Sequence, residues 1–310
     1  MRKILITGGA GFIGSHVSQA LFDNGFEVRV FDLKYSRTEK IESIQGDILD
    51  RDLLENAVQG CDAIVHLAAQ ISVPRSLDDP EETMENNVKG TKNVIEAAKK
   101  HGIKRIVLAS SAAVYGDSTH LPLREERLGN ILSPYASSKL KNEEQAILAR
   151  QDGLETVALR FFNVYGPGQS FEGPYASVIP KMTEKIVRGE KPIIYGDGLQ
   201  TRDFIHVSDV AQSILKILGI DWSKTFSPVY NVATQHQTSL LDLVEIINTS
   251  CLKIGLIEEA RETVFETVRK GDIRHSLAST ERIRKEIGWS PLIDISQGVH
   301  QLIEEKWVVE

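Results

Sequence analysis

Cysteine is scarce in this sequence, whose 310 residues include only Cys61 and Cys251. The two thiols lie far apart and show no metal-ligand spacing, so we expect reduced thiols in a cytoplasmic protein and no disulfide framework. Apolar runs long enough to span a bilayer are also missing. Because the amino terminus is itself typical of a core strand, we expect no signal peptide.

A surplus of positive charge is missing as well. The formal net charge is −7, whereas nucleic-acid and anionic-membrane surfaces depend on basic patches. We therefore expect no nucleic-acid partner and no membrane partner, and an anionic substrate has to be met by local cations. With 41% hydrophobic residues and no internal repeat, the chain is long enough for a large core in one or two domains.

A glycine-rich loop stands near the start of the chain. An apolar segment leads directly into residues 7–14, Thr-Gly-Gly-Ala-Gly-Phe-Ile-Gly, and a helical pattern follows. In a dinucleotide-binding loop, Gly8 makes the tight turn, Gly11 lets a pyrophosphate approach the backbone, and Gly14 lets helix and strand pack closely. The phosphates then meet free amide groups at the helix N-terminus, and Phe12 and Ile13 are further candidate cofactor contacts.

A second apolar strand-like segment, 26–32, follows this loop and closes on Asp32. A carboxylate at this position accepts hydrogen bonds from the adenosine ribose and repels a 2′-phosphate. We therefore predict NAD as the cofactor. Lys34 and Arg37 lie close by in the sequence and keep NADP open as the alternative.

Strand-like and helix-like segments alternate through the first half of the chain, at 63–67, 88–100, 105–111, 135–150 and 156–164. This alternation predicts an α/β fold, a Rossmann-like doubly wound parallel sheet with a smaller C-terminal substrate-binding lobe. Ligands of such sheets bind beyond the carboxyl ends of the strands. The candidate cofactor contacts that fall there are Asp47, Ile48, Leu67, Ala68 and Ala69.

The pattern becomes irregular over 167–202, and regular segments resume at 204–207, 209–218 and 229–232. We interpret this change as a departure from the sheet and a return to it. The predicted domains are an NAD-binding domain of residues 1–168 and approximately 203–234, and a smaller lobe of approximately 169–202 and 235–310.

A phenol and an amine four residues apart, Tyr135 and Lys139, follow Ser133 and Pro134. Ser133 is a good N-cap and Pro134 a good first helical residue, so both side chains are expected on one face of a helix that begins there. Ser111 ends the preceding strand-like segment, and the three side chains can therefore converge. A tyrosine with a pKa of about 10 is a poor base at neutral pH, but a neighbouring ammonium favours the phenolate.

Characteristic segments recur along nearly the whole chain, at 7–14, 86–91, 110–116, 133–139, 160–166, 201–207 and 269–272. In these segments the chain resembles the extended short-chain dehydrogenase/reductases that act on nucleotide sugars, especially the UDP-hexose 4-epimerases. By this resemblance Tyr135 takes the proton of the sugar 4-hydroxyl while NAD⁺ takes the hydride from C4, and Ser111 relays the proton. The resemblance also implies that Lys139 holds the nicotinamide ribose and lowers the tyrosine pKa, and that Asn86 contacts the cofactor.

The residues after the catalytic serine separate reaction types in this family. Sugar 4,6-dehydratases carry an acidic pair there and UDP-glucuronate decarboxylases a glutamate, whereas Ala112 and Ala113 follow Ser111 here. Without a carboxylate to drive elimination, the oxidised sugar is reduced again. The resemblance therefore predicts 4-epimerisation of a UDP-hexose through a transient 4-keto sugar.

The same resemblance implies a set of substrate contacts, because the sugar can turn over only if the nucleotide is held firmly. The implied contacts with UDP are Asn163, Tyr195, Arg202, Arg269 and Asp272. Ser276 borders the sugar, and a small residue there predicts that UDP-N-acetylglucosamine is accepted along with, or instead of, UDP-glucose.

Other functions on the same scaffold stay open at this point. They are a uronic acid 4-epimerase, a nucleotide-sugar dehydrogenase/reductase and, more distantly, a non-catalytic NAD-binding regulator. His206 and His275 are interpreted as ordinary structural histidines, and no metal is predicted. Homodimers through a four-helix contact are usual in the family, and the predicted helices over 88–100 and 135–150 are suited to it.

Overall fold

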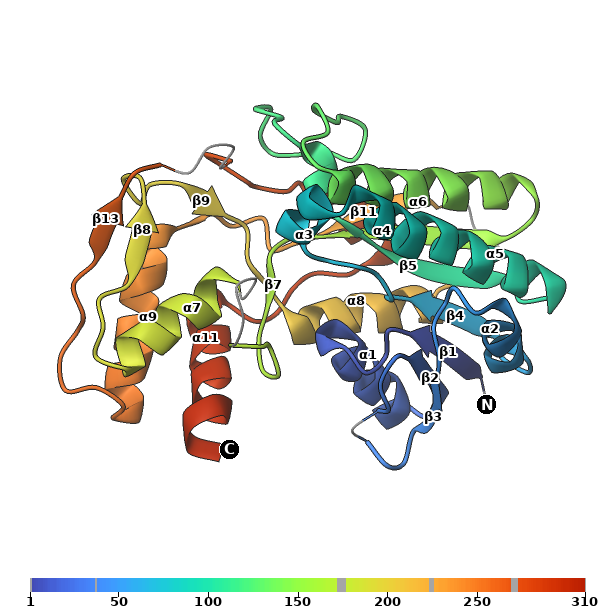
Figure 1. The fold of residues 1–310 in the computed structure, drawn as a ribbon, viewed down its shortest axis with the longest axis horizontal. Helices are drawn as coiled ribbons and strands as arrows, with labels where there is room; N and C mark the ends of the chain where they lie inside the picture. Colours follow the sequence, from blue (N-terminus) through green and yellow to red (C-terminus); the bar gives the residue numbers. More distant parts are fainter. Residues whose placement is uncertain (1, 37, 172–176, 223–225, 269–272, 310) are drawn as a thin grey trace.

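A seven-stranded sheet forms the centre of the computed structural model, which describes residues 2–36, 38–171, 177–222, 226–268 and 273–309 (Figure 1). The strand order is β11-β6-β5-β4-β1-β2-β3, and every pair is parallel. The strands are β1 (Lys3–Thr7), β2 (Glu27–Asp32), β3 (Glu42–Gln45), β4 (Ala63–His66), β5 (Arg105–Ser111), β6 (Glu155–Phe161) and β11 (Val229–Val232). The predicted doubly wound parallel sheet is confirmed.

Two hydrophobic cores cover the two faces of the sheet because successive side chains of a strand point to opposite sides. Ile4 and Ile6 of β1 pack into the core shared with α1 (Phe12–Asp23) and α8 (Val207–Gly219). Leu5 packs into the other core, with α2 (Arg51–Val58) and α5 (Gly90–Lys100). The long helix α6 (Pro134–Gln151) lies beside α5 on this second face.

The segment expected to return to the sheet at 204–207 does so only in part. Its strand β10 (Ile205–His206) pairs with β7 (Val164–Tyr165) in a separate two-stranded ribbon, and only α8 and β11 rejoin the main layers. The chain leaves the sheet between β6 and β7, where Asn163 Nδ2 donates a hydrogen bond of 2.8 Å to the Asp203 carbonyl. This contact ties the outgoing and returning segments together beyond the strand ends.

A smaller lobe lies beside the carboxyl ends of the strands, at the left of Figure 1. Its core is built on α7 (Val178–Val187), α9 (Leu240–Ile254) and α11 (Ile295–Glu304). Its ribbons are β8 (Ile193–Tyr195) with β13 (Val264–Glu266) and β9 (Thr201–Arg202) with β12 (Thr238–Ser239). The remaining elements are α3 (Val73–Asp78), α4 (Pro80–Met84), the π-helix η1 (Glu85–Lys89), the 3₁₀-helix η2 (Ala112–Tyr115), α10 (Glu281–Ile287) and the π-helix η3 (Glu305–Val309). Among these α10 packs against β11, so the last part of the chain contacts both halves of the molecule.

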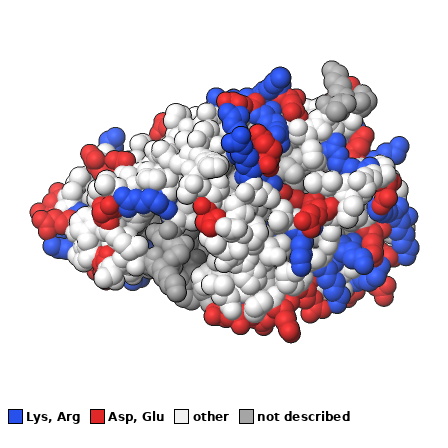
Figure 2. Space-filling view, turned by 90° about the horizontal axis from the view of Figure 1, so that it is seen from above, with Lys and Arg blue, Asp and Glu red and all other residues white. Residues whose placement is uncertain are grey.

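Acidic and basic side chains lie intermixed on the face shown in Figure 2, and the described residues there form no continuous basic area. Within the described part of the chain, no helix combines the length and the apolar character that a membrane crossing needs.

Candidate active site

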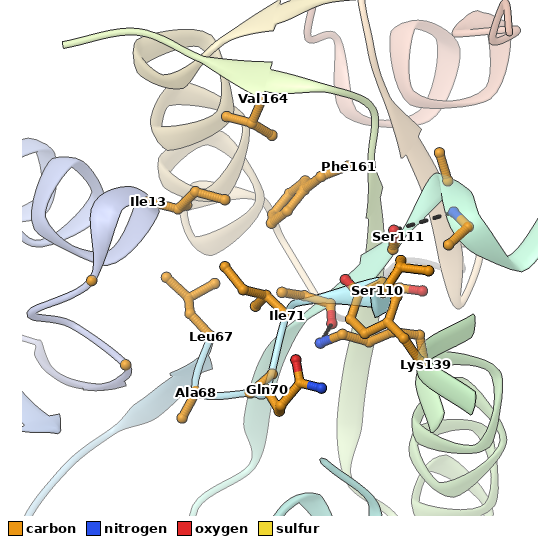
Figure 3. A pocket seen from close by; sticks show the side chains of 18 of the residues that line it. Ile13, Leu67, Ala68, Gln70, Ile71, Ser110, Ser111, Lys139, Phe161 and Val164 are labelled. Atoms are coloured by element: carbon orange, nitrogen blue, oxygen red, sulfur yellow. Dashed lines mark hydrogen bonds between the residues drawn. The ribbon is translucent and has the colours of Figure 1, made fainter. Parts of the chain in front are cut away.

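One cavity of about 1040 Å³ lies at the carboxyl ends of β1, β4 and β5, where the strand order reverses between β1 and β4 (Figure 3). The smaller lobe contributes the opposite wall. The predicted site residues that line this cavity are Gly8, Gly11, Phe12, Ile13, Gly14, Asp32, Asp47, Ile48, Leu67, Ala68, Ala69, Asn86, Ser111, Tyr135, Lys139, Asn163, Arg202 and Ser276. Segments that are far apart in the sequence are therefore gathered around a single space.

The turn after β1 has the geometry of a phosphate-binding loop. Gly8 adopts a φ of +72°, and a Cβ added to it would lie 2.6 Å from the Ala68 amide nitrogen. A Cβ on Gly14 would lie 2.0 Å from the Gly8 carbonyl oxygen, so a side chain is excluded at both positions. The N-cap of α1 is Gly11, which makes no side-chain capping bond, and the helix N-terminus is thus left to a ligand's phosphates. This loop fits a dinucleotide.

The Asp32 carboxylate is held in place at the end of β2. One oxygen accepts the Ala10 N–H at 3.0 Å and the other accepts the Lys34 N–H at 3.1 Å. Because each carboxylate oxygen has further lone pairs, these bonds leave acceptor positions for ribose hydroxyls. Arg37, which kept NADP open as the alternative, lies outside the described residues.

The helix that carries the phenol and the amine begins as the sequence predicts. Ser133 is the N-cap of α6, its side chain accepts the Ala136 N–H at 3.1 Å, and Pro134 is the first helical residue. The first two turns of α6 thereby point the Tyr135 and Lys139 side chains toward the end of β5.

Ser111, Tyr135 and Lys139 meet at that point (Figure 3). The Ser111 side chain is close enough to the Tyr135 phenol to lower its pKa. Lys139 Nζ donates to the Ala109 carbonyl at 3.0 Å and lies 5.9 Å from the centre of the Tyr135 ring. The Lys139 ammonium is therefore anchored to β5 and lies near the Tyr135 ring.

Burial controls the protonation of both groups. Burial raises the pKa of Tyr135 above its ordinary value, and the nearby Ser111 side chain opposes this rise only in part. Burial lowers the pKa of Lys139 to about 8, against the opposing effect of the Glu143 carboxylate. The structure thus differs from the lowered tyrosine pKa that the sequence predicts, because burial, which raises the pKa of Tyr135, is its largest cause.

Two of the five UDP contacts implied by the resemblance, Asn163 and Arg202, line the cavity among the described residues. Asn163 is held at the cavity wall by its bond to the Asp203 carbonyl. One guanidinium nitrogen of Arg202 donates to the Thr201 carbonyl at 2.9 Å. Tyr195, on β8, is not among the residues lining the cavity, so its contact with uracil stays a prediction. Arg269 and Asp272 lie outside the described residues.

The two histidines differ from one another. His206 is buried at the N-terminus of α8, where its ring accepts the Ser208 N–H at 3.3 Å and burial lowers its pKa to about 4. His275 departs from the expectation of a core residue, because it is exposed, lines the cavity and lies 3.0 Å from the Thr201 hydroxyl. The described residues include no group of three or more His, Cys, Asp and Glu side chains placed to hold a metal ion.

The carboxylates at the cavity are few. Ala112 and Ala113 follow Ser111 on its wall, and the described acidic residues that line it are Asp32, Asp47 and Glu82. Glu82 accepts a hydrogen bond of 2.9 Å from the Arg75 guanidinium.

Asn87, which is buried next to the site, is a supporting residue that sequence reasoning missed. Its side-chain oxygen accepts the Gln70 N–H at 2.7 Å, and its amide nitrogen bonds to Ser138 Oγ at 2.9 Å. It thus fastens the loop after β4 to the catalytic helix. Its position beside Asn86, which lines the cavity, was the available signal.

Comparisons with known proteins give the same family from sequence and from structure. The model of the "NAD dependent epimerase/dehydratase family" matches residues 4–233. A putative UDP-glucose 4-epimerase from Methanocaldococcus jannaschii is 37% identical over 308 residues, 97% of each chain. A UDP-N-acetyl-α-D-glucosaminuronate decarboxylase from Bacillus cytotoxicus is 33% identical over 80% of this chain and 79% of that protein.

A similar solved structure is the UDP-N-acetylglucosamine 4-epimerase from Methanobrevibacter ruminantium in complex with UDP-N-acetylmuramic acid. It is 34% identical, with a TM-score of 0.89 over 99% of this chain and 98% of that chain.

Proposed function

The chain belongs to the NAD-dependent epimerase/dehydratase family, and we propose that it catalyses the 4-epimerisation of a UDP-hexose through a transient 4-keto sugar. The proposal rests on the arrangement of residues around the cavity. Ser111, Tyr135 and Lys139 meet in the cavity that also contains the glycine turn and Asp32, and two alanines follow the serine. This set provides for oxidation and reduction at one carbon but places no acid where elimination requires one.

In this proposal, different residues bind the cofactor and act on the substrate. Gly8, Gly11 and Asp32 fit the pyrophosphate and the adenosine ribose, and Lys139 would bind the nicotinamide ribose. Bound NAD supplies a hydride acceptor for the sugar carbon. Tyr135 Oη takes the proton of the 4-hydroxyl, with Ser111 sharing the hydrogen bond, and gives it back when the sugar is reduced on its other face.

The proposed substrates are UDP-glucose and UDP-N-acetylglucosamine. Arg202 and Asn163 line the cavity, and guanidinium groups bind phosphate oxygens through charge-assisted hydrogen bonds, which supports a diphosphate contact there. Ser276, at 8% exposure, places a small side chain on the cavity wall, which leaves room for a 2-acetamido group. The relatives named above as UDP-glucose and UDP-N-acetylglucosamine 4-epimerases agree with both substrates.

A uronic acid substrate is the second candidate, because one relative is a decarboxylase of such a sugar. Binding its carboxylate calls for a cation near the sugar. Arg75 lines the cavity, but its guanidinium donates to Glu82. We therefore favour the neutral hexoses.

The test is incubation of the purified protein with UDP-glucose and, separately, with UDP-N-acetylglucosamine and UDP-glucuronic acid, without added reductant. NMR follows the 4-epimers, and Tyr135→Phe serves as the control. Formation of a galacto-configured product that the control lacks supports the proposal and identifies the sugar. A stable 4-keto-6-deoxy product, or NADH formed in proportion to substrate consumed, contradicts it.

A further inference from the structure

A buried ion pair lies behind the catalytic residues. Glu143 on α6 and Arg160 on β6 each have side chains only 3% exposed. Arg160 Nε donates to Glu143 Oε1 at 2.9 Å, and a second guanidinium nitrogen donates to Oε2 at 2.7 Å. Burying two charges is costly, and such pairs are often no more stabilising than apolar side chains of the same size. Stabilisation of the fold is therefore a weak explanation for the presence of this buried ion pair.

The Glu143 carboxylate is connected to both segments that carry the catalytic groups. It lies one helical turn after Lys139 on α6. The same oxygen that accepts from Arg160 also accepts the hydroxyl of Ser110, which directly precedes Ser111 at the end of β5. One side chain thus links the strand of the catalytic serine to the helix of the catalytic lysine.

Arg160 is held rigidly on its other side. Its remaining nitrogen donates to Tyr115 Oη at 2.9 Å and to the Glu125 carbonyl at 3.0 Å. Tyr115 in turn donates to Asn231 Oδ1 at 2.6 Å. The guanidinium therefore has partners for each of its nitrogens, and a satisfied buried network of this kind keeps its members in one arrangement.

We propose that Glu143, held by Arg160, is a positioning residue for the catalytic trio, fixing the end of β5 that carries Ser111 and supplying negative charge one turn below the Lys139 ammonium. The proposal rests on the proposed function in so far as Lys139 and Ser111 are catalytic.

The charges around Lys139 make this assignment specific. On its own helix it faces Tyr135 and Glu143, and from β4 it faces His66, which burial keeps neutral by lowering its pKa to about 3. Arg160, from β6, lies behind Glu143. Among the described groups, Glu143 is the carboxylate that opposes the effect of burial on the Lys139 pKa.

The experiment compares Glu143→Gln, which keeps the shape of the side chain but removes its charge, with Glu143→Asp, which keeps the charge. The protein as purified is labelled with ¹³C and ¹⁵N at lysine, and NMR follows the titration of Lys139, assigned by its loss in Lys139→Met. We expect the Lys139 pKa to fall by about one unit or more in Glu143→Gln and to stay within about half a unit of wild type in Glu143→Asp. The alkaline limb of the activity profile should move with it.

The control is Asp209→Asn, which removes another buried carboxylate, 2% exposed, at the start of α8. It should lower the melting temperature without moving the Lys139 titration. The same result for Glu143→Gln, a lower melting temperature with an unchanged titration, would mean a merely structural role and would overturn the proposal.

If Glu143→Gln does not fold, the double variant Glu143→Gln/Arg160→Gln removes both buried charges. Because losing the Arg160 cation raises the Lys139 pKa while losing the nearer Glu143 carboxylate lowers it, we expect a smaller fall in the pKa than in the single variant, and no fall at all would overturn the proposal. The NMR titration needs no turnover. A shifted titration in a protein that epimerises no sugar would therefore contradict the proposed function and leave the positioning role standing.

Discussion

The Tyr135 hydroxyl is the group through which the proposed proton transfer passes, and Tyr135 lines the cavity together with Ser111. Positioned proton transfer contributes about 10²- to 10⁴-fold to enzymatic rates. We expect Tyr135→Phe to lower kcat by that factor while the affinity for UDP stays near wild type. Steady-state kinetics and calorimetric titration with UDP measure the two quantities. Tyr35→Phe, at a tyrosine 65% exposed, is the matched control, and a Tyr135→Phe rate above about one tenth of wild type contradicts the role.

Ser276 is the residue at which the two proposed sugars should be separated. Its side chain is buried on the cavity wall. Its N–H donates to the Thr201 carbonyl at 3.1 Å, which restrains the backbone from moving away from the cavity to admit a larger side chain. We predict that Ser276→Tyr lowers kcat/KM for UDP-N-acetylglucosamine by about 10-fold or more relative to UDP-glucose, because a phenol fills the space beside the 2-acetamido group. Ser276→Ala should keep both activities. Equal losses for the two sugars in Ser276→Tyr would place the 2-substituent elsewhere.

At the scale of elements, the start of α6 joins stability to catalysis. The Ser133 side chain accepts the Ala136 N–H, and the proposed catalytic residues Tyr135 and Lys139 lie on the turns that follow. Ser133→Ala should cost about 1 kcal/mol of stability, as for other lost N-caps, and should also lower kcat because the first turn frays. Chemical denaturation and kinetics measure both. Ser239→Ala removes the N-cap of α9, so it should cost similar stability with kcat unchanged.

A loss of kcat in both cap variants would mean that general destabilisation, and not the position of α6, limits the rate.

The elements that could be predicted are those with a strong local signal. The apolar segment before the glycine loop and the Ser133-Pro134 pair both act through neighbouring residues, and the structure has strand β1 at the first and the start of α6 at the second. The ribbon of β7 and β10 could not be told from a strand of the main sheet. Each of these strands has only two residues. Their pairing, like the contact of Asn163 with a carbonyl 40 residues away, joins segments that are distant in the sequence.

The same distinction holds at the scale of the whole molecule. The glycine turn, Asp32 and the Tyr135-Lys139 spacing could be found from the sequence because each motif is local. Glu143 and Arg160 could not, because a charged residue in a helix or strand ordinarily faces water. Their pairing becomes visible only when α6 and β6 are packed together and both charges are buried.

The outer side of α6 is where a second copy of the chain is expected to bind. α5 and α6 lie side by side on one face of the sheet (Figure 1), and α6 exposes Ile147 and Leu148, which are 39% and 59% accessible. Pairing this face with its copy would give a four-helix contact and bury both side chains. We therefore predict a homodimer with about twice the chain mass of 34.5 kDa.

Light scattering coupled to size-exclusion chromatography measures this mass, and Leu148→Glu should convert the dimer to a monomer, because it would bury two unpaired carboxylates at the interface. In a monomer the same substitution is solvent-exposed and should change stability by no more than about 0.5 kcal/mol. Leu292→Glu, at a leucine 85% exposed in the loop before α11, is the control and should remain dimeric. A dimer that survives Leu148→Glu would have to associate through another face, and a monomeric wild type would show that the cavity is complete within one chain.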